Sequence, residues 1–189
     1  MSEIDVLKKE NILEKFLDSR EIKEILRIID NLGLKEACLC AGAIRNNLWN
    51  IIDGKELEFD TDIDVIFYDK EISYEKTCEI EDSLKENYPK YNWELKNQVY
   101  MHIHSSSEAF LNVEEAISKF PETCTAVGII FEKDSYKWIA PYGLEDIFNK
   151  IVRPTPEFRK NKRKMNIYIN RVKNKKWEKK WKDIKVFYE

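Results

Sequence analysis

The 189-residue sequence lacks the features of disordered, membrane-spanning and zinc-binding proteins. It has only five glycines, while 43% of its residues are hydrophobic and 12% are aromatic, which excludes disordered and fibrous proteins. No hydrophobic run approaches the roughly 20 residues that a membrane helix requires, and residues 1–10 are too charged for a signal peptide. We therefore expect a cytoplasmic globular protein with a substantial core and no membrane partner.

The few cysteines and histidines do not show the spacing of a metal site. The four cysteines show no C-x-x-C spacing, and there are only two histidines, so a zinc site is not expected. Cys38 and Cys40 stand two apart in an apolar run, which indicates buried free thiols on one face of a strand. His102 and His104 lack a third soft ligand nearby and are interpreted as surface or hydrogen-bonding residues.

Charge is distributed unevenly along the chain. Residues 1–149 carry 17 basic and 31 acidic side chains, whereas residues 150–189 carry 15 basic and 4 acidic side chains. The two parts therefore have net charges of −14 and +11. Such a basic segment suits a phosphate-rich partner, but it can equally neutralise the acidic part of its own protein.

The order of sequence patterns predicts an α/β (α+β) domain. We expect two helices in the first thirty residues, a strand at 37–41 with a tight turn at Gly42 into a helix, a strand at 61–68 and a helix at 73–87. Further strands are predicted at 92–103, 123–131 and 136–140, with a short helix at 144–150. The prediction is a small mixed sheet flanked by helices in residues 1–150, followed by a basic helical C-terminal extension, residues 151–189, packed on the same domain.

Two acidic residues at the start of the strand at 61–68 are candidate metal ligands. Asp62 and Asp64 alternate along the strand and therefore project to one face, where two carboxylates can share hard cations. The alternative is a solvated strand end that happens to carry two acids. The sequence pair alone does not distinguish these interpretations.

A second candidate feature lies upstream, where the strand at 37–41 passes through Gly42 into a helix. This turn would direct backbone N–H groups and the positive end of the helix toward an anion. Arg45, on the first turn of the helix, adds a donor fork suited to phosphate. Together with Asp62 and Asp64, the turn supplies the two halves of a metal–triphosphate site.

These motifs carry a family resemblance. Gly42-Ala43-x-Arg45 followed by Asp62-Ile63-Asp64 resembles the signature of the DNA polymerase β-type nucleotidyltransferase superfamily, in the form found in CCA-adding and poly(A) polymerases. More closely, the sequence resembles a bacterial nucleotidyltransferase-like family whose members largely lack an assigned substrate. The similar blocks are residues 41–49, 61–65, 96–102, 120–128 and 140–148.

The resemblance implies a polymerase β-type nucleotidyltransferase fold and assigns roles to individual residues. Asp62 and Asp64 would bind two Mg²⁺ (or Mn²⁺) ions, together with a third carboxylate on a neighbouring strand that helps to deprotonate an acceptor hydroxyl. Glu94 is the candidate for this third, catalytic and metal-binding acid, the alternative being an edge-strand glutamate that faces water. The nucleotide-binding residues implied are Gly42, Ala43, Arg45, Asn46 and Asn97.

Several assignments have alternatives. Asn97 and Gln98 either orient a base or acceptor or satisfy backbone groups of the sheet. Ala43 departs from the superfamily pattern, in which a glycine or serine is often found, and so removes a hydroxyl that could contact phosphate. Trp177 and Trp181, one helical turn apart among lysines, either stack on RNA or dock on the domain, and docking is the favoured interpretation.

The sequence hypothesis is a metal-dependent nucleotidyltransferase that moves a nucleoside monophosphate from an NTP to a hydroxyl of an unidentified small molecule, protein or RNA. The alternative is a catalytically silent nucleotide- or RNA-binding module with the same fold. A third possibility is an adaptor whose basic extension contacts RNA.

Overall fold

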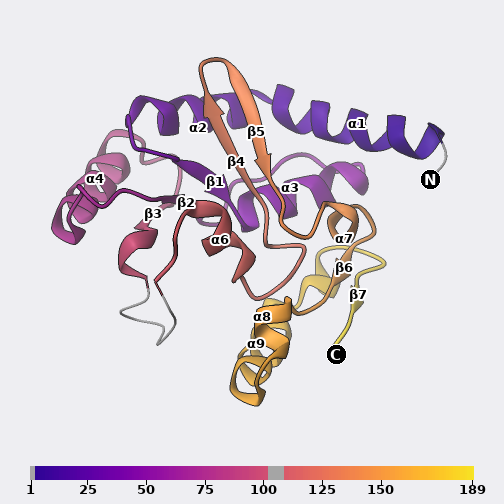
Figure 1. Ribbon diagram of the computed structural model, residues 1–189. Coiled ribbons are helices and arrows are strands. Elements are labelled where there is room, and N and C mark those ends of the chain that lie inside the picture. Colours follow the sequence, from indigo (N-terminus) through magenta and orange to yellow (C-terminus); the bar gives the residue numbers. More distant parts are fainter. Residues whose placement is uncertain (1–2, 102–108) are drawn as a thin grey trace.

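The computed structural model describes residues 3–101 and 109–189. A five-stranded mixed sheet with the strand order β3-β2-β1-β4-β5 forms its centre (Figure 1). The strands are β1 (Cys38–Cys40), β2 (Ile63–Phe67), β3 (Trp93–Asn97), β4 (Gly128–Glu132) and β5 (Ser135–Ile139). β2 and β3 are parallel, and the other neighbouring strands are antiparallel. This arrangement confirms the predicted small mixed sheet.

Helices cover both faces of the sheet and form two hydrophobic clusters. The helices before the extension are α1 (Glu3–Asp18), α2 (Arg20–Asn31), α3 (Gly42–Ile52), α4 (Tyr74–Asn87), α6 (Val113–Ser118) and α7 (Glu145–Phe148). The larger cluster joins α1, α2, α3 and α4 to Leu39, Val65 and Ile129 of the sheet. The smaller cluster, on the alternate strand residues, joins Cys40 and Ile66 to α6. The sheet is therefore buried on both faces.

Local sequence signals account for the first helices and strands. In α2 the buried isoleucines and leucine recur at helical spacing, and the hydroxyl of Ser19 accepts a hydrogen bond from the backbone N–H of Ile22 at 3.3 Å. Cys38 and Cys40 are buried and free, as predicted, and Cys78 and Cys124 are also free. No helix in the described residues is long and apolar enough to cross a membrane.

Two predicted strands are shorter by several residues in the structure. The strand expected at 92–103 ends at Asn97, whose side chain accepts a hydrogen bond from the N–H of Val99 and starts the short 3₁₀ helix η1 (Gln98–Tyr100). The strand expected at 123–131 begins only at Gly128. The preceding residues form a buried turn, because the carbonyl of Glu122 accepts hydrogen bonds from the N–H groups of Thr125 and Ala126.

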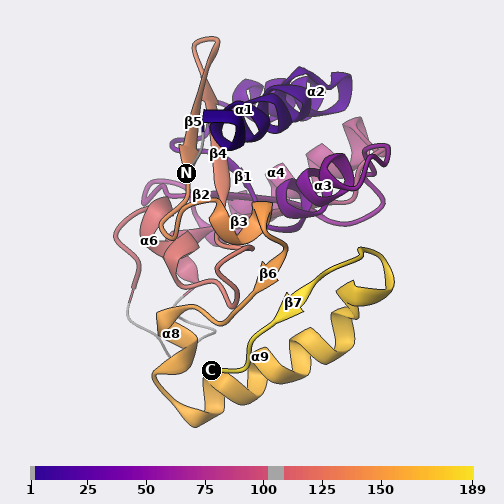
Figure 2. The same ribbon diagram turned by 90° about the vertical axis from the view of Figure 1, so that its right-hand side faces the viewer.

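The C-terminal extension contains helices and also a second, two-stranded parallel sheet. Its elements are β6 (Ile151–Val152), α8 (Pro156–Arg159), α9 (Lys162–Lys175), the 3₁₀ helix η2 (Trp177–Lys179) and β7 (Lys185–Val186). Figure 2 shows β7 returning alongside α9 beneath the main sheet. The extension joins the main core because Trp177 and Trp181 each pack against the ring of Trp49, at centroid distances of 6.1 and 5.1 Å.

Candidate functional site

The parallel pair β2–β3 places three acidic residues at one end of the sheet. Asp64 of β2 lies directly opposite Glu94 of β3, so both side chains project from the same face. Asp62 immediately precedes β2, is exposed, and accepts a hydrogen bond from the side-chain amide of Asn92. The smaller hydrophobic cluster covers this face at Ile66 but not at Asp64. The three predicted carboxylates therefore lie along one open edge.

The acidic residues repel one another. Burial, followed by the like charges of Glu94 and Asp62, raises the pKa of the Asp64 carboxyl from 3.8 to about 6. The carboxyl groups of Asp64 and Glu94 are within hydrogen-bonding reach, and Glu94 also forms an ion pair with Lys96 at 3.3 Å. A shared proton or a bound cation would relieve the repulsion at Asp64.

The chemistry of these donors fits a divalent cation. Carboxylate oxygens are the ligands that Mg²⁺ and Mn²⁺ prefer. Across the described residues, no three histidine, cysteine, aspartate or glutamate side chains are already gathered as they are around a bound metal ion. The fit therefore rests on the oxygen donors of Asp62 and Asp64, with Glu94 beside them, and on the net repulsion that raises the pKa of Asp64.

The turn into α3 offers unpaired backbone N–H groups. Ala41, between β1 and α3, has φ 58° and ψ −122°, a conformation that is unfavourable for a residue with a Cβ atom. α3 begins at Gly42 without a side-chain cap, whereas Ser19, Ser73 and Asn161 cap α2, α4 and α9. The first N–H groups of a helix have no partner within it, so this end can receive an anion.

A cavity of about 190 Å³ brings Asp62, Asp64 and the α3 turn together with the C-terminal extension, whereas Glu94 lies beside Asp64 and outside the cavity lining. Acidic groups line its β2 side, and cationic and indole side chains of the extension line the other side. The lining residues are Ala41, Gly42, Arg45, Asn46, Thr61, Asp62, Asp64, Arg171, Lys175, Trp177, Lys180 and Trp181. The arrangement suits a ligand that combines a divalent cation with phosphates.

Arg45 and Asn46, which are predicted to bind nucleotide, line this cavity, but their polar groups already bond to protein. The Arg45 side chain is 2% exposed and lies 5.2 Å from the ring of Trp49 and 4.6 Å from that of Trp177. Its Nε and one terminal nitrogen donate to Oδ1 of Asn46, and the other terminal nitrogen donates to Oγ1 of Thr125 at 2.5 Å. The guanidinium is therefore fixed by the core.

Asn97 is not brought to the cavity. It lies at the opposite end of β3 from Glu94, and its amide donates to the carbonyls of Asp69 and Ile72 at 2.7 and 3.1 Å. Its side-chain oxygen accepts from the N–H of Val99 at 3.2 Å. These bonds correspond to the backbone-satisfying alternative and not to the predicted contact with a nucleotide.

Two further groups of candidates have different outcomes. The amide of Gln98 contacts the carbonyl of Lys96 at 3.4 Å, away from the cavity lining. His102 and His104 lie outside the described residues.

The sequence prediction missed the contribution of the extension to this cavity. Trp177 and Trp181 are each 3% exposed, which confirms the docking interpretation of these two residues. Their docking places Arg171, Lys175 and Lys180 on the cavity wall. The net charge of +11 on residues 150–189 indicated a basic extension, but periodicity alone did not show which of its basic residues lie near Asp62 and Asp64.

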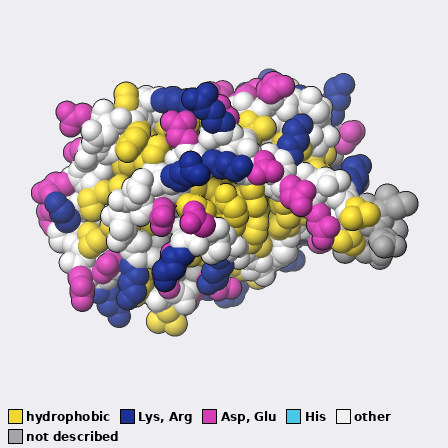
Figure 3. All heavy atoms as spheres, turned by 90° about the horizontal axis from the view of Figure 1, so that it is seen from above, with side chains coloured by type: hydrophobic (Ala, Val, Ile, Leu, Met, Phe, Trp, Pro, Cys, Tyr) yellow, Lys and Arg dark blue, Asp and Glu magenta, His cyan; other side chains and the backbone are white. Residues whose placement is uncertain are grey.

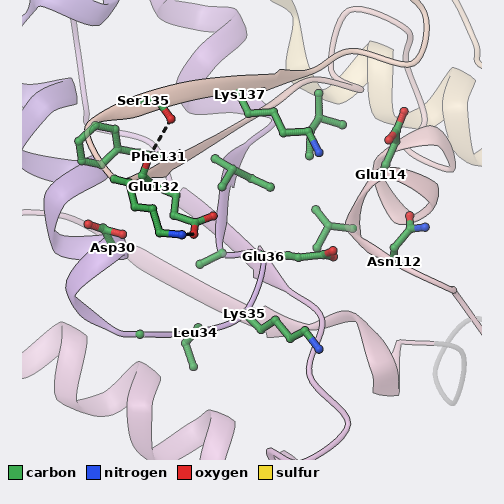
Figure 4. Close-up of a pocket in the computed structure, with 16 residues that line it drawn as sticks. Asp30, Leu34, Lys35, Glu36, Asn112, Glu114, Phe131, Glu132, Ser135 and Lys137 are labelled. Carbon is green, nitrogen blue, oxygen red and sulfur yellow. Dashed lines mark hydrogen bonds and ion pairs between the residues drawn. The ribbon is translucent and has the colours of Figure 1, made fainter.

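A larger hollow of about 880 Å³ lies elsewhere, between the β4–β5 hairpin, the α2–β1 loop and the start of α6 (Figure 4). Its rim alternates Glu36, Glu114 and Glu132 with Lys35 and Lys137, and it shares no residue with the cavity at Asp64. Figure 3, which looks onto α1, α2 and the hairpin tip, also shows intermingled charges of both signs. These features define no preferred ligand charge.

Comparison with known proteins connects this geometry to a family. Residues 27–186 match the family described as nucleotidyltransferase. A solved structure described as a CCA-adding enzyme head domain is 45% identical, has a TM-score of 0.87, and is matched over 94% of this chain and 95% of its own. No curated protein sequence matches the chain.

More distant structures share the fold. A CCA-adding enzyme in complex with CTP has a TM-score of 0.59 at 12% identity, over 95% of this chain and 43% of its own. A CCA-adding enzyme in complex with ATP has a TM-score of 0.51 at 13% identity, over 85% of this chain and 39% of its own. The chain thus spans less than half the length of these two enzymes.

Proposed function

The chain belongs to the nucleotidyltransferase family, and we propose that it transfers a nucleoside monophosphate from a nucleoside triphosphate to a hydroxyl group of an acceptor. One observation carries this proposal: Asp62 and Asp64 share a cavity with the uncapped start of α3 and with cationic side chains of the extension. The cavity combines carboxylate ligands for a divalent cation with hydrogen-bond donors for phosphate oxygens.

In the proposed reaction, the acceptor oxygen forms a bond to the α-phosphorus, the bond from that phosphorus to the bridging oxygen breaks, and pyrophosphate leaves. The N–H groups of Gly42 and Ala43 bind phosphate oxygens. A carboxylate oxygen of Glu94 accepts the hydroxyl proton. Asp62 and Asp64 would hold Mg²⁺ or Mn²⁺, which when bound supplies charge stabilisation for the phosphate oxygens.

The size of the cavity indicates which part of the nucleotide it takes. A volume of about 190 Å³ is below the roughly 300–1,000 Å³ of cavities that enclose a whole drug-sized ligand. We therefore place the phosphates inside the cavity and the ribose and base toward its mouth. CTP and ATP are the first nucleotides to test, because fold relatives are described as complexes with them.

The decisive experiment supplies CTP or ATP labelled at the α-phosphate, with Mg²⁺ or Mn²⁺ and either cell extract or its RNA fraction. We expect a labelled product and released pyrophosphate. Asp64→Asn should lower the rate by more than about 100-fold, because it removes a carboxylate ligand. Asp60→Asn is the matched control, since Asp60 is exposed and does not line the cavity. Equal rates for the wild type and Asp64→Asn would refute the proposal.

A catalytically silent nucleotide- or RNA-binding module is the second candidate. It is favoured by the lack of an assembled group of three metal-binding side chains in the described residues, and by Ala43, which offers no hydroxyl to phosphate. This candidate predicts binding of Mg²⁺–CTP or Mg²⁺–ATP without pyrophosphate release in any extract fraction. Release that depends on Asp64 would exclude it.

A further inference from the structure

Two arginines reach the candidate cavity, and they differ in what their guanidinium groups can still bind. Arg45 is 2% exposed, and all three of its nitrogens donate to Asn46 or Thr125. The side chain of Arg171, from the C-terminal half of α9, is 33% exposed. A phosphate at Arg45 would have to compete with existing hydrogen bonds, which are costly to break in a buried site.

A single buried carboxylate fixes Arg171. Nε of Arg171 donates to Oε1 of Glu122 at 2.7 Å. No other side-chain hydrogen bond of Arg171 occurs within the described parts of the chain. Because Nε is the inner nitrogen of the guanidinium, this bond leaves the donors of the two terminal nitrogens for a ligand, and Arg171 lines the cavity.

Glu122 is held in a fixed position beneath Arg171. Glu122 is 0% exposed, and its backbone carbonyl accepts hydrogen bonds from the N–H groups of Thr125 and Ala126 at 3.0 and 2.9 Å. Its second carboxylate oxygen, Oε2, is buried without a hydrogen-bond partner. Burying a carboxylate with one oxygen unpaired costs folding stability. We therefore explain the Glu122–Arg171 ion pair by its effect on the position of Arg171 and not by a gain in stability.

We infer that Arg171, positioned by Glu122, binds the phosphates of the nucleotide, while Arg45 holds the wall of the cavity. This inference rests on the proposed function and deepens it by assigning the phosphate contact to the C-terminal extension. Arg171 lines the same cavity as Asp62 and Asp64, and its charge acts on Asp64, so one ligand can present its cation to the acids and its phosphates to the guanidinium.

The neighbouring lysines contribute differently. Lys180 is paired with Glu58 at 2.6 Å, and Lys175 is exposed on a flexible side chain. A lysine acts on phosphate as a point charge, whereas an arginine held at Nε presents two directed donors. Arg171 is therefore the directional contact, and Lys175 and Lys180 add positive charge.

The test uses inorganic tripolyphosphate with Mg²⁺, measured by calorimetry, because this probe has phosphates but no base. We expect Arg171→Gln to weaken binding by about 10- to 100-fold, the range for a charge-assisted hydrogen-bonding group. Glu122→Gln keeps the cation but loosens its position, so we expect a smaller loss of about 3- to 10-fold. Lys173→Gln, an exposed change on the same helix outside the cavity, should stay within about 2-fold of wild type.

Mn²⁺ alone separates phosphate binding from a merely structural role. Removing the positive charge of Arg171 should leave Mn²⁺ binding unchanged or tighter, because that charge faces the acids that would hold the ion. Arg171→Gln leaves Glu122 buried and unpaired, so the double variant Glu122→Gln/Arg171→Gln is included to restore a neutral pair. We expect it to fold, bind Mn²⁺ and still bind tripolyphosphate weakly.

The inference would be overturned if folded Arg171→Gln or the folded double variant bound tripolyphosphate as the wild type does. That outcome would leave the proposed function intact. Loss of Mn²⁺ binding in parallel with tripolyphosphate would also overturn the inference, because the change would then be structural. A wild-type protein that binds neither CTP, ATP nor tripolyphosphate would remove the proposed function and this inference together.

Discussion

The two ends of the β2–β3 pair differ in how well their polar groups are satisfied. At one end, the Asn97 amide is 3% exposed and bonds to backbone groups of Asp69, Ile72 and Val99. At the other end, Asp64 and Glu94 face each other with like charge. The polar groups of the same strand pair are therefore hydrogen-bonded at one end, whereas at the other, strained end two carboxylates repel each other. A bound cation would relieve this repulsion.

The largest expected effect comes from breaking the satisfied end. Asn97→Ala removes several hydrogen bonds and leaves buried backbone groups unpaired, so we expect a loss of about 3 kcal/mol in the free energy of unfolding. Urea denaturation measures this loss. Asn92→Ala, at the exposed strained end, is the comparison variant and should cost less than about 1 kcal/mol. Equal losses would contradict the distinction between the two ends.

Relieving the strained end should stabilise the protein. The raised pKa of Asp64 means that ionising this carboxyl costs stability as pH rises from about 4 to about 6, and the cost is fully present above pH 6. In metal-free buffer at pH 7.5, Asp64→Asn should therefore increase the free energy of unfolding by about 2 kcal/mol. Thermal or urea unfolding measures the gain.

The pH dependence of this gain provides its control. Well below pH 3.8, where Asp64 is protonated in both the folded and the unfolded protein, Asp64→Asn should have little effect. Asp60→Asn, in the exposed loop before Asp62, should have little effect at either pH. A destabilised Asp64→Asn protein at pH 7.5 would show that the acids are already compensated.

A divalent cation should relieve the same strain without a mutation. Millimolar Mn²⁺ is expected to stabilise the wild type by on the order of 1 kcal/mol, through binding to the folded state. The melting temperature with Mn²⁺ or with EDTA measures this effect. Asp64→Asn should lose most of the shift, whereas Asn97→Ala should retain it. An equal shift in all three proteins would indicate Mn²⁺ binding elsewhere.

Local patterns were sufficient to predict most of the fold. Alternation predicted that Asp62 and Asp64 share one face of a strand; in the structure Asp62 lies just before β2, and Asp64 lies on it. The pairing of Asp64 with Glu94 comes from the strand register, which periodicity does not convey. The early end of β3 was not visible in the same way, because a side-chain cap at Asn97 overrides the β propensity of the residues that follow.

Relations between distant segments could not be predicted in the same way. The pairing of Glu122 with Arg171 joins residues 49 positions apart, and the packing of Trp49 against Trp181 joins the domain to the extension. Charge arithmetic indicated that the extension is basic, but only the docked tryptophans show that Arg171 faces the cavity. Long-range packing therefore decides which cations serve the site.

The smallest expected effect concerns backbone strain beside the same cavity. Ala41, at φ 58° and ψ −122°, occupies a conformation that glycine adopts more readily, so Ala41→Gly should stabilise the protein by about 1 kcal/mol. Ala43→Gly is a control of opposite sign, because Ala43 lies within α3 and glycine there should cost about 1 kcal/mol. Urea unfolding of both variants measures the difference. If Ala41→Gly also lowers tripolyphosphate affinity, the strain at Ala41 helps to direct the N–H groups of α3 into the cavity; if affinity is unchanged, the strain affects stability alone.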